Sequence, residues 1–180
     1  METYIALLRG VNVGGSRPVS MAELKALFEE NGFENVSTYI QSGNVIFSAP
    51  AGCRDEIRQK CADMIAARFG FEVPVAVISA QELKEALDHA PDWWGNDKDA
   101  KHNAIFVIPP AVPEDVFREV GGIRPEYEKA EAYDSVIFWS APIATFSRTR
   151  LMRVVGSGVY GNITIRNANT TKKLRDLAES

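Results

Sequence analysis

The fold is decided by residues 4–48, YIALLRGVNVGGSRPVSMAELKALFEENGFENVSTYIQSGNVIFS. The apolar run Tyr4–Leu8 predicts a buried strand, and a Gly-rich loop follows it. Ser20 and Glu23 have the spacing of a capping box and open an apolar helical stripe. Two more short apolar runs flank the turn at residues 42–44, so they predict a hairpin. This stretch therefore predicts the order strand–helix–strand–strand.

The elements that follow complete this unit and then repeat its order. Helical spacing over Arg54–Phe69 and an apolar run at Val73–Ile78 give βαββαβ for residues 1–79. Residues 80–102 hold a short connecting helix and a polar linker, and residues 103–180 repeat the order and add a terminal helix. We therefore expect an α+β protein of two ferredoxin-like βαββαβ halves with a C-terminal helix. In the second half the expected strands are 104–108, 126–132, 136–140 and 163–166, and the expected helices are 114–120, 147–155 and 170–178.

The composition is that of a globular protein, with 46% hydrophobic and 24% charged residues among 180. A net charge of −4 argues against a protein that coats DNA non-specifically. The charge is unevenly distributed, because residues 143–180 carry seven Lys or Arg against two acids. This basic segment favours an anionic partner, or else it packs near the acidic middle of the same chain.

The two cysteines, Cys53 and Cys61, are eight residues apart on one helix face, so we expect both to be small core residues. They predict no disulfide framework, and with His89 and His102 they show no metal-ligand spacing, so no metal site is predicted. No apolar run is long enough to span a membrane, and the N-terminus METYIALLRG lacks the basic start of a signal peptide. We therefore expect a cytoplasmic protein without membrane association.

The Gly-rich loop, residues 9–19, is the first candidate binding site. Glycines let backbone N–H groups turn toward a ligand, and arginines pair with phosphate or carboxylate. A helix N-terminus follows and favours an anion. The spacing matches neither a dinucleotide-binding fingerprint nor a P-loop, so a plain strand-to-helix crossover is the alternative. The candidate ligand-binding residues here are Arg9, Asn12, Gly14, Gly15 and Arg17.

The hairpin turn is the second candidate, although a tight turn by itself needs no ligand. In a βαββαβ unit the end of the first strand and the turn between the second and third strands lie at the same edge of the sheet. The Gly-rich loop and this turn are therefore expected to be adjacent, so that their polar groups converge. The candidate residues are Gln41, Ser42 and Asn44.

The third candidate is the loop 166–173, RNANTTKK, which leaves a strand and enters a helix. Asn169 or Thr170 is a good N-cap, which accounts for the loop without a ligand. Lysines in the first helical turn oppose the helix dipole, however, and an anion bound there would offset them. The candidate residues are Arg166, Asn167, Asn169, Thr170 and Lys173.

Other polar and aromatic groups carry less specific signals. Residues 145–150 hold hydroxyls and arginines but are typical of a solvated helix start. Trp93 and Trp94 could stack on a base or sugar, or cover the seam between the halves, which we favour. No Ser-His-Asp order and no G-x-S-x-G elbow is present, and His102 is expected to be a structural or surface residue.

Three stretches, METYIALLRGVNVGG, MAELKALFEENGFENVSTYIQSGNVIFS and RNANTTKKL, resemble a bacterial family known as domain of unknown function 1697. The likeness covers essentially the whole chain and is strongest in residues 3–48 and 163–174. It implies a soluble, mostly bacterial α+β protein with two ferredoxin-like halves, and it implies no established reaction. The family pattern has Trp after the Arg-Asn pair where this chain has Ala168, so a site that uses this Trp is altered or lost here.

Together the three loops predict a protein that binds a phosphate-bearing small molecule, of which a nucleotide is one candidate, in one composite site. Two alternatives remain: an RNA-binding module, and a protein-interaction or oligomerisation module. RNA binding needs outward aromatic rings on the central strands. Near the centre of the first half only Tyr4 and Phe47 qualify, and the overall acidity also disfavours RNA binding. No cofactor, reaction or oligomeric state is predicted.

Overall fold

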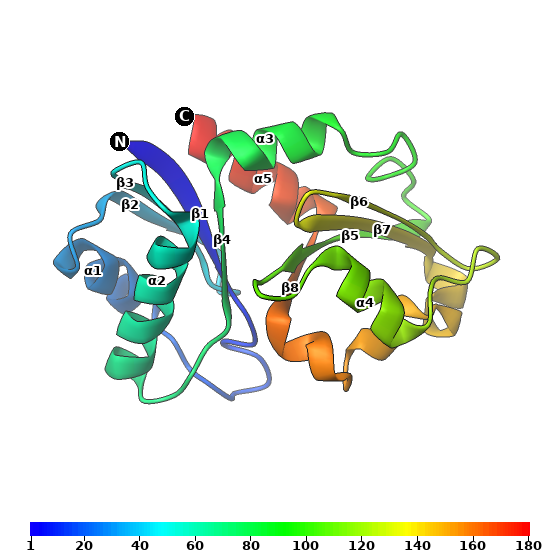
Figure 1. The fold of residues 1–180 in the computed structure, drawn as a ribbon, viewed down its shortest axis with the longest axis horizontal. Coiled ribbons are helices and arrows are strands. Elements are labelled where there is room, and N and C mark those ends of the chain that lie inside the picture. Colours follow the sequence, from blue (N-terminus) through cyan, green and yellow to red (C-terminus); the bar gives the residue numbers. More distant parts are fainter. The chain divides into compact units, whose positions relative to one another are not determined.

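The computed structural model describes residues 1–180, which form two compact units. The first unit comprises residues 1–84 and 174–180, and the second comprises residues 85–173. Each unit has one four-stranded antiparallel sheet with its own helices, as Figure 1 shows. The prediction of an α+β fold with two ferredoxin-like halves and a C-terminal helix is confirmed, except that 3₁₀ helices replace the second α-helix of the second half. None of the helices is long and apolar enough to cross a membrane.

The first unit contains its strands and helices in the predicted order. They are β1 (Glu2–Leu8), α1 (Met21–Glu30), β2 (Glu34–Tyr39), β3 (Asn44–Ala49), α2 (Arg54–Phe69) and β4 (Val75–Ser79), followed by α3 (Ala80–Asp88). The strand order in the sheet is β2-β3-β1-β4, which is the ferredoxin-like order. The central pair is β1 and β3, with Ile5 opposite Ile46.

The helices of this unit begin and end where local chemistry favours it. Ser20 is extended, and its Oγ accepts the Glu23 N–H at 3.3 Å, so α1 starts at a capped end. Leu24 and Phe28 follow at helical spacing and are both buried. Helix α2 ends at Gly70, whose φ of 80° is a left-handed conformation that glycine adopts without a steric cost.

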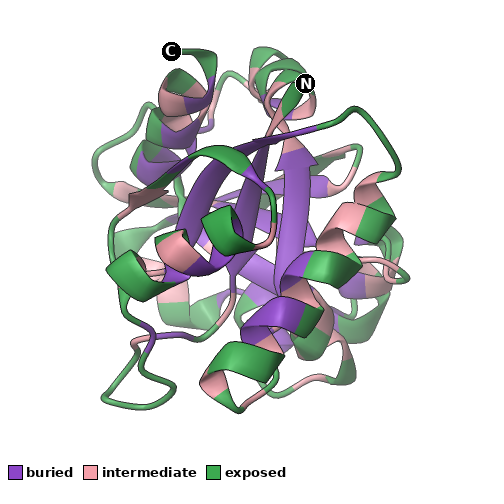
Figure 2. Ribbon diagram, turned by 90° about the vertical axis from the view of Figure 1, so that its left-hand side faces the viewer, coloured by how far each residue is buried: buried purple, intermediate pink, exposed green.

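The core of the first unit lies between the sheet and helices α1 and α2. The ring of Phe47 is 4.7 Å from that of Phe33 and 5.2 Å from that of Phe28, centroid to centroid. Tyr4 stacks on Phe47 at 5.9 Å. Figure 2 shows the buried strands in purple, next to helices whose outer surfaces are green and exposed. Tyr4 and Phe47 are core residues and do not supply the exposed rings that RNA binding by this sheet would require.

The two cysteines differ in burial. Cys61 is buried in this core, as expected, and burial raises the pKa of its thiol to about 12. Cys53 is exposed, so the expectation that it is a core residue is wrong. The reason is that α2 begins at Arg54, which leaves Cys53 ahead of the first helical turn.

The second unit repeats the strand order of the first. Its elements are β5 (Ala100–Val107), α4 (Pro113–Val120), β6 (Lys129–Tyr133), β7 (Val136–Pro142), β8 (Ile163–Asn167) and α5 (Ala168–Glu179). The sheet order is β6-β7-β5-β8, again with the first and third strands in the centre. Ile105, Ile137 and Leu151 are fully buried in its core. The end of α5, residues 174–180, groups with the first unit.

The connection between β7 and β8 corrects one prediction, because the α-helix expected over residues 147–155 does not form. Three short 3₁₀ helices take its place: η1 (Ile143–Arg148), η2 (Leu151–Val154) and η3 (Gly158–Asn162). Thr149 is extended, with φ −72° and ψ 151°, and interrupts the helical path. The Glu128 carboxylate accepts the N–H groups of Arg150 and Leu151. A side chain distant in sequence thus stabilises this irregular conformation.

The start of α5 corrects a second prediction. The N-cap is Asn167, whose Oδ1 accepts the Thr170 N–H at 2.8 Å, and not Asn169 or Thr170. The helix consequently begins at Ala168, and Lys173 lies in its second turn. First-turn lysines that oppose the helix dipole are therefore absent, and this reason for an anion at the loop no longer holds.

The β2–β3 turn packs directly against the end of β1. The Leu8 N–H donates to the Gly43 carbonyl at 2.8 Å. A Cβ atom at Gly43 would lie 2.8 Å from the Cβ of Leu8 and 2.9 Å from Cγ2 of Val11, which is closer than carbon atoms pack. Gly43 also has a φ of +87°. The turn therefore needs glycine for its conformation and for its close packing.

Gly43→Ala should destabilise the first unit more than Gly32→Ala does. Both glycines have a φ of +87°, so the conformational cost is shared, but a Cβ at Gly32 would have no atom within 4 Å. We expect Gly43→Ala to lower the free energy of unfolding by about 1–3 kcal/mol more, which is the usual cost of overpacking. Urea unfolding of both variants measures this difference, and equal losses would contradict the packing argument.

Candidate functional site

The Gly-rich loop lies against the β2–β3 turn, as the strand order predicts. The Asn12 side chain makes the link, because its Nδ2 donates to the Gln41 carbonyl at 2.8 Å and to the Val19 carbonyl at 2.9 Å. Its Oδ1 accepts the Val19 N–H at 2.8 Å. Both amide hydrogens and the amide oxygen of Asn12 are therefore engaged in holding the loop.

Asn44 has a similar role in the turn itself. Its side chain is buried, and Nδ2 donates to the Tyr39 carbonyl at 2.9 Å and to Ser42 Oγ at 3.0 Å. Gly14 and Gly15 have positive φ, as a tight crossover requires. The amides of Asn12 and Asn44 thus stabilise the chain's own conformation. Ligand binding stays a prediction for all the candidate residues of these two loops.

Arg166, expected to bind a ligand, is a buried side chain of β8. It is 7% exposed, and its Nη1 donates to Thr164 Oγ1 at 2.7 Å and to the Ile165 carbonyl at 3.0 Å. Burial lowers the pKa of its guanidinium to about 10, so the group still carries its charge at pH 7. These contacts indicate that the Arg166 side chain stabilises β8.

The neighbouring asparagines line a polar hollow of about 420 Å³ in the second unit. Asn167 and Asn169 were both expected to bind a ligand, and they border this hollow together with Lys98 and His102. Thr170 and Lys173 are not among its lining residues. The Gly-rich loop belongs to the first unit, and the composite site that would join it to this loop stays a prediction.

His102 also lines a second hollow, of about 360 Å³, in the same unit. Trp93, Tyr127 and Pro142 give this hollow aromatic and apolar walls, and Ser140 lines it as well. The two hollows adjoin, because they share the residues Asn96, Asp97, Ala100 and His102.

The His102 side chain is fixed on both of its ring nitrogens. His102 on β5 is the register partner of Ser140 on β7, and its Nδ1 lies within hydrogen-bonding distance of Ser140 Oγ. Its Nε2 lies 2.7 Å from the Asp97 carbonyl oxygen. This pair was not predicted from the sequence. Position 102 fell in the expected linker, before the strand expected at 104–108, whereas β5 begins at Ala100 and the register of β5 and β7 aligns His102 with Ser140.

The two tryptophans have different roles. Trp94 is 3% exposed, its Nε1 donates to the Asn103 carbonyl at 2.9 Å, and its ring meets Phe138 edge-on at 4.9 Å. The Lys172 ammonium lies 5.6 Å from the centre of the same ring. Trp94 is thus a packing residue of the second unit, whereas Trp93 is half-buried at the second hollow.

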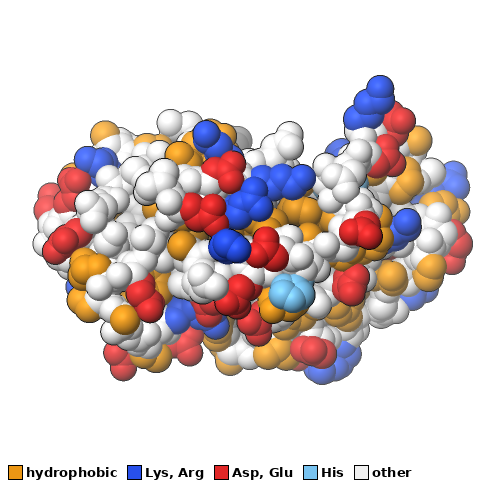
Figure 3. Space-filling model, turned by 90° about the horizontal axis from the view of Figure 1, so that it is seen from above, with side chains coloured by type: hydrophobic (Ala, Val, Ile, Leu, Met, Phe, Trp, Pro, Cys, Tyr) orange, Lys and Arg blue, Asp and Glu red, His pale blue; other side chains and the backbone are white.

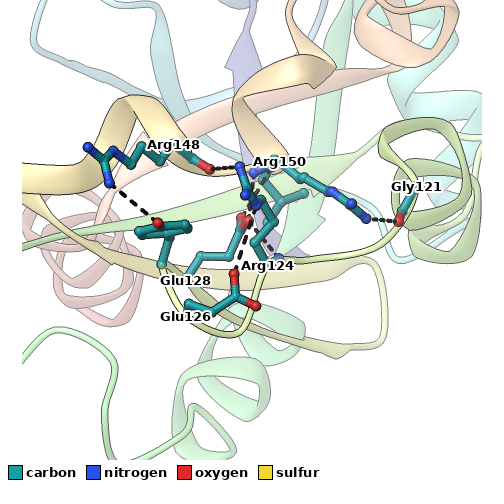
Figure 4. A network of polar contacts seen from close by, with 8 residues as sticks. Gly121, Arg124, Glu126, Glu128, Arg148 and Arg150 are labelled. Carbon is teal, nitrogen blue, oxygen red and sulfur yellow. Dashed lines mark hydrogen bonds and ion pairs between the residues drawn. The ribbon is translucent and has the colours of Figure 1, made fainter.

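The buried carboxylate of Glu128, which lines the second hollow, is the centre of a network of polar contacts (Figure 4). Glu128 is 3% exposed and accepts the backbone N–H groups of Arg124 at 2.9 Å, Arg150 at 2.6 Å and Leu151 at 3.1 Å. Three charge-assisted hydrogen bonds offset the desolvation of the carboxylate. The turn before β6, which carries Tyr127 and Glu128 at the edge of the hollow, is thereby tied to the 3₁₀ segment.

Two arginines of the same network, Arg124 and Arg148, also contact the Tyr127 ring. The guanidinium carbons of Arg124 and Arg148 lie 5.0 and 5.6 Å from the ring centre. Arg148 Nη1 lies 3.4 Å from the Tyr127 hydroxyl. Arg148 is exposed, as expected for a solvated segment, but its neighbour Arg150 donates to the Gly121 carbonyl at 2.7 Å.

Charges alternate on the surface seen in Figure 3, where acidic and basic side chains are interspersed. That face offers no broad basic surface of the kind that binds nucleic-acid backbones. No group of three or more His, Cys, Asp or Glu side chains is arranged to hold a metal ion.

Comparison with protein families supports the resemblance seen in the sequence. The family model "Protein of unknown function (DUF1697)" matches residues 1–138. The chain belongs to the DUF1697 family. A solved structure, "conserved bacterial protein SP0830 from Streptococcus pneumoniae", is similar over 98% of both chains, with a TM-score of 0.87 and 28% identity. No curated protein matches the chain. The comparisons therefore support the two-unit fold and name no ligand.

Glu128→Gln should destabilise this DUF1697 protein, because it removes the charge that three N–H groups share and turns an amide NH₂ toward them. Hydrogen bonds to a charged group contribute roughly 1.5–3 kcal/mol, so we expect a loss of about 2 kcal/mol in the free energy of unfolding. Urea unfolding measures it.

The matched control is Glu126→Gln, two residues away. Glu126 Oε2 is 3.9 Å from Arg124 Nε, and the Glu126 side chain is 67% exposed. Exposed ion pairs contribute little, so this variant should lose less than about 1 kcal/mol. A loss at Glu126 as large as that at Glu128 would contradict the role assigned to the buried carboxylate.

Proposed function

We propose that this protein binds a phosphate-bearing small molecule in the second unit, with the phosphate in the polar hollow at the start of α5. The observation that supports this proposal is the set of residues that line the hollow. Asn167, Ala168 and Asn169 come from the strand end and helix start, Lys98 from the segment before β5, and His102 from β5. Amide and ammonium groups are donors that a phosphate accepts from.

The helix orientation adds to the attraction for an anion. Helix α5 runs for twelve residues from Ala168, so its positive end lies at the hollow. Asp97 also lines the hollow and opposes an anion, but its Oδ1 accepts the Asp99 N–H at 2.9 Å. Lys98 is an exposed cation next to it in the chain.

The second hollow suits the rest of such a ligand. Its volume of about 360 Å³ is within the usual range for small-molecule sites, and Trp93 and Tyr127 offer rings for stacking. Because the hollows share His102, one molecule with a phosphate and an aromatic or apolar part would occupy both. A nucleotide is one compound of that kind.

Lys98→Glu should weaken this binding at least tenfold, which corresponds to about 1.4 kcal/mol. Isothermal titration with inorganic phosphate and with adenosine monophosphate measures it. Lys25→Glu is the charge-matched control, since Lys25 lies on α1 and pairs with Glu29 at 2.9 Å. It should leave the affinity unchanged.

Two results would contradict the proposal. One is the absence of binding by the unmodified protein to either compound at millimolar concentration. The other is loss of affinity in Arg17→Glu with none in Lys98→Glu, which would assign the site to the Gly-rich loop of the first unit instead.

A further inference from the structure

We propose that Ser140 is a nucleophile for acyl transfer, that His102 is its general base, and that the protein hydrolyses a small uncharged ester in the second hollow. This activity goes beyond ligand binding and does not require a phosphate.

The sheet aligns the groups that such a reaction needs. Ser140 on β7 is the register partner of His102 on β5 and of Lys129 on β6. Residues directly opposite one another in antiparallel strands have side chains on the same face, with Cβ atoms about 5 Å apart. A base, a hydroxyl and an ammonium group therefore form one row across three strands, and all three line the same hollow.

We assign the tautomer of His102 from its shorter contact. Nε2 lies 2.7 Å from the Asp97 carbonyl oxygen, which can only accept, and 3.2 Å from the Asp97 nitrogen, whose N–H also points to it. The assignment from the shorter contact places the hydrogen on Nε2. Nδ1 is then the basic nitrogen, and it is the one that contacts Ser140 Oγ. In an activated nucleophile of this kind, a base contacts the hydroxyl and a third group orients the base.

The hollow sets the class of substrate. Ser140 is only 6% exposed, so its hydroxyl is reached through the hollow. Pro125, Tyr127, Pro142 and Trp93 give the hollow walls that favour an apolar acyl or alkoxy group. The volume of about 360 Å³ limits the substrate to a small ester.

The reaction balances with water as the only co-reactant. Ser140 Oγ forms a bond to the ester carbonyl carbon while its proton moves to His102 Nδ1. Lys129, which lines the same hollow, supplies a cation for the oxyanion that develops. The carbon–oxygen bond to the alcohol breaks, and the alcohol leaves with the proton from His102. Water then attacks the acyl-serine by the same route and releases the acid and free Ser140.

A fluorophosphonate, which phosphonylates activated serines, tests the proposal directly on the full chain without any phosphate ligand. Mass spectrometry should find one adduct, on the peptide that contains Ser140, and Ser140→Ala should remove it. His102→Ala should slow labelling about 100-fold, the lower part of the range for general-base catalysis. Ser147→Ala, at an exposed serine of η1, should label like the unmodified protein.

Hydrolysis of p-nitrophenyl acetate provides the second measurement. Lys129→Met should lower kcat at least tenfold with little change in KM, because the ammonium acts on the transition state. Circular dichroism and Tm confirm that each variant is folded. Absence of an adduct on Ser140, or equal labelling rates with and without His102, would overturn the proposal. Neither result depends on phosphate binding, so the two proposals fail separately.

Discussion

Each unit depends on the antiparallel pairing between its first and third strands. In the first unit this pairing places the end of β1 against the β2–β3 turn, so close that Gly43 cannot carry a Cβ without meeting Leu8. In the second unit the same pairing places His102 opposite Ser140. One topological constraint therefore produces a tightly closed turn in one unit and a hydrogen-bonded His102–Ser140 pair in the other.

The two units use their polar groups differently as a result. In the first unit the amides of Asn12 and Asn44 hydrogen-bond to backbone carbonyls and complete the loop and turn. In the second unit several polar side chains line the two hollows, and the buried Glu128 carboxylate, which lines one of them, ties the turn before β6 to the 3₁₀ segment. The site that we propose therefore lies where polar groups are held beside a hollow, and not in the glycine-rich loop.

The strand order, α1, α2 and the contact between the Gly-rich loop and the turn could all be predicted from the sequence, because they follow from local periodicity, capping and topology. The conformation of residues 147–155 could not, since it depends on Glu128, about twenty residues away in the chain. The burial of Arg166 and the N-cap role of Asn167 were missed for a related reason. The alternation of polar and apolar residues along a short strand does not show which polar side chain will be buried, as Arg166 is. The N-cap was missed because Asn167, Asn169 and Thr170 can all cap a helix, so the predicted helix start can be wrong by two residues. The site around His102 required the register of β5 and β7, which only the folded sheet defines.

A functional site around His102 in the second unit can be tested by two-dimensional NMR of the ¹⁵N-labelled protein, titrated with adenosine monophosphate. We expect shifts for the amides of His102, Asn167 and Asn169 and for the Trp93 indole, with the amides of Gly10, Gly14 and Gly15 unmoved. Shifts confined to the glycine amides would contradict it.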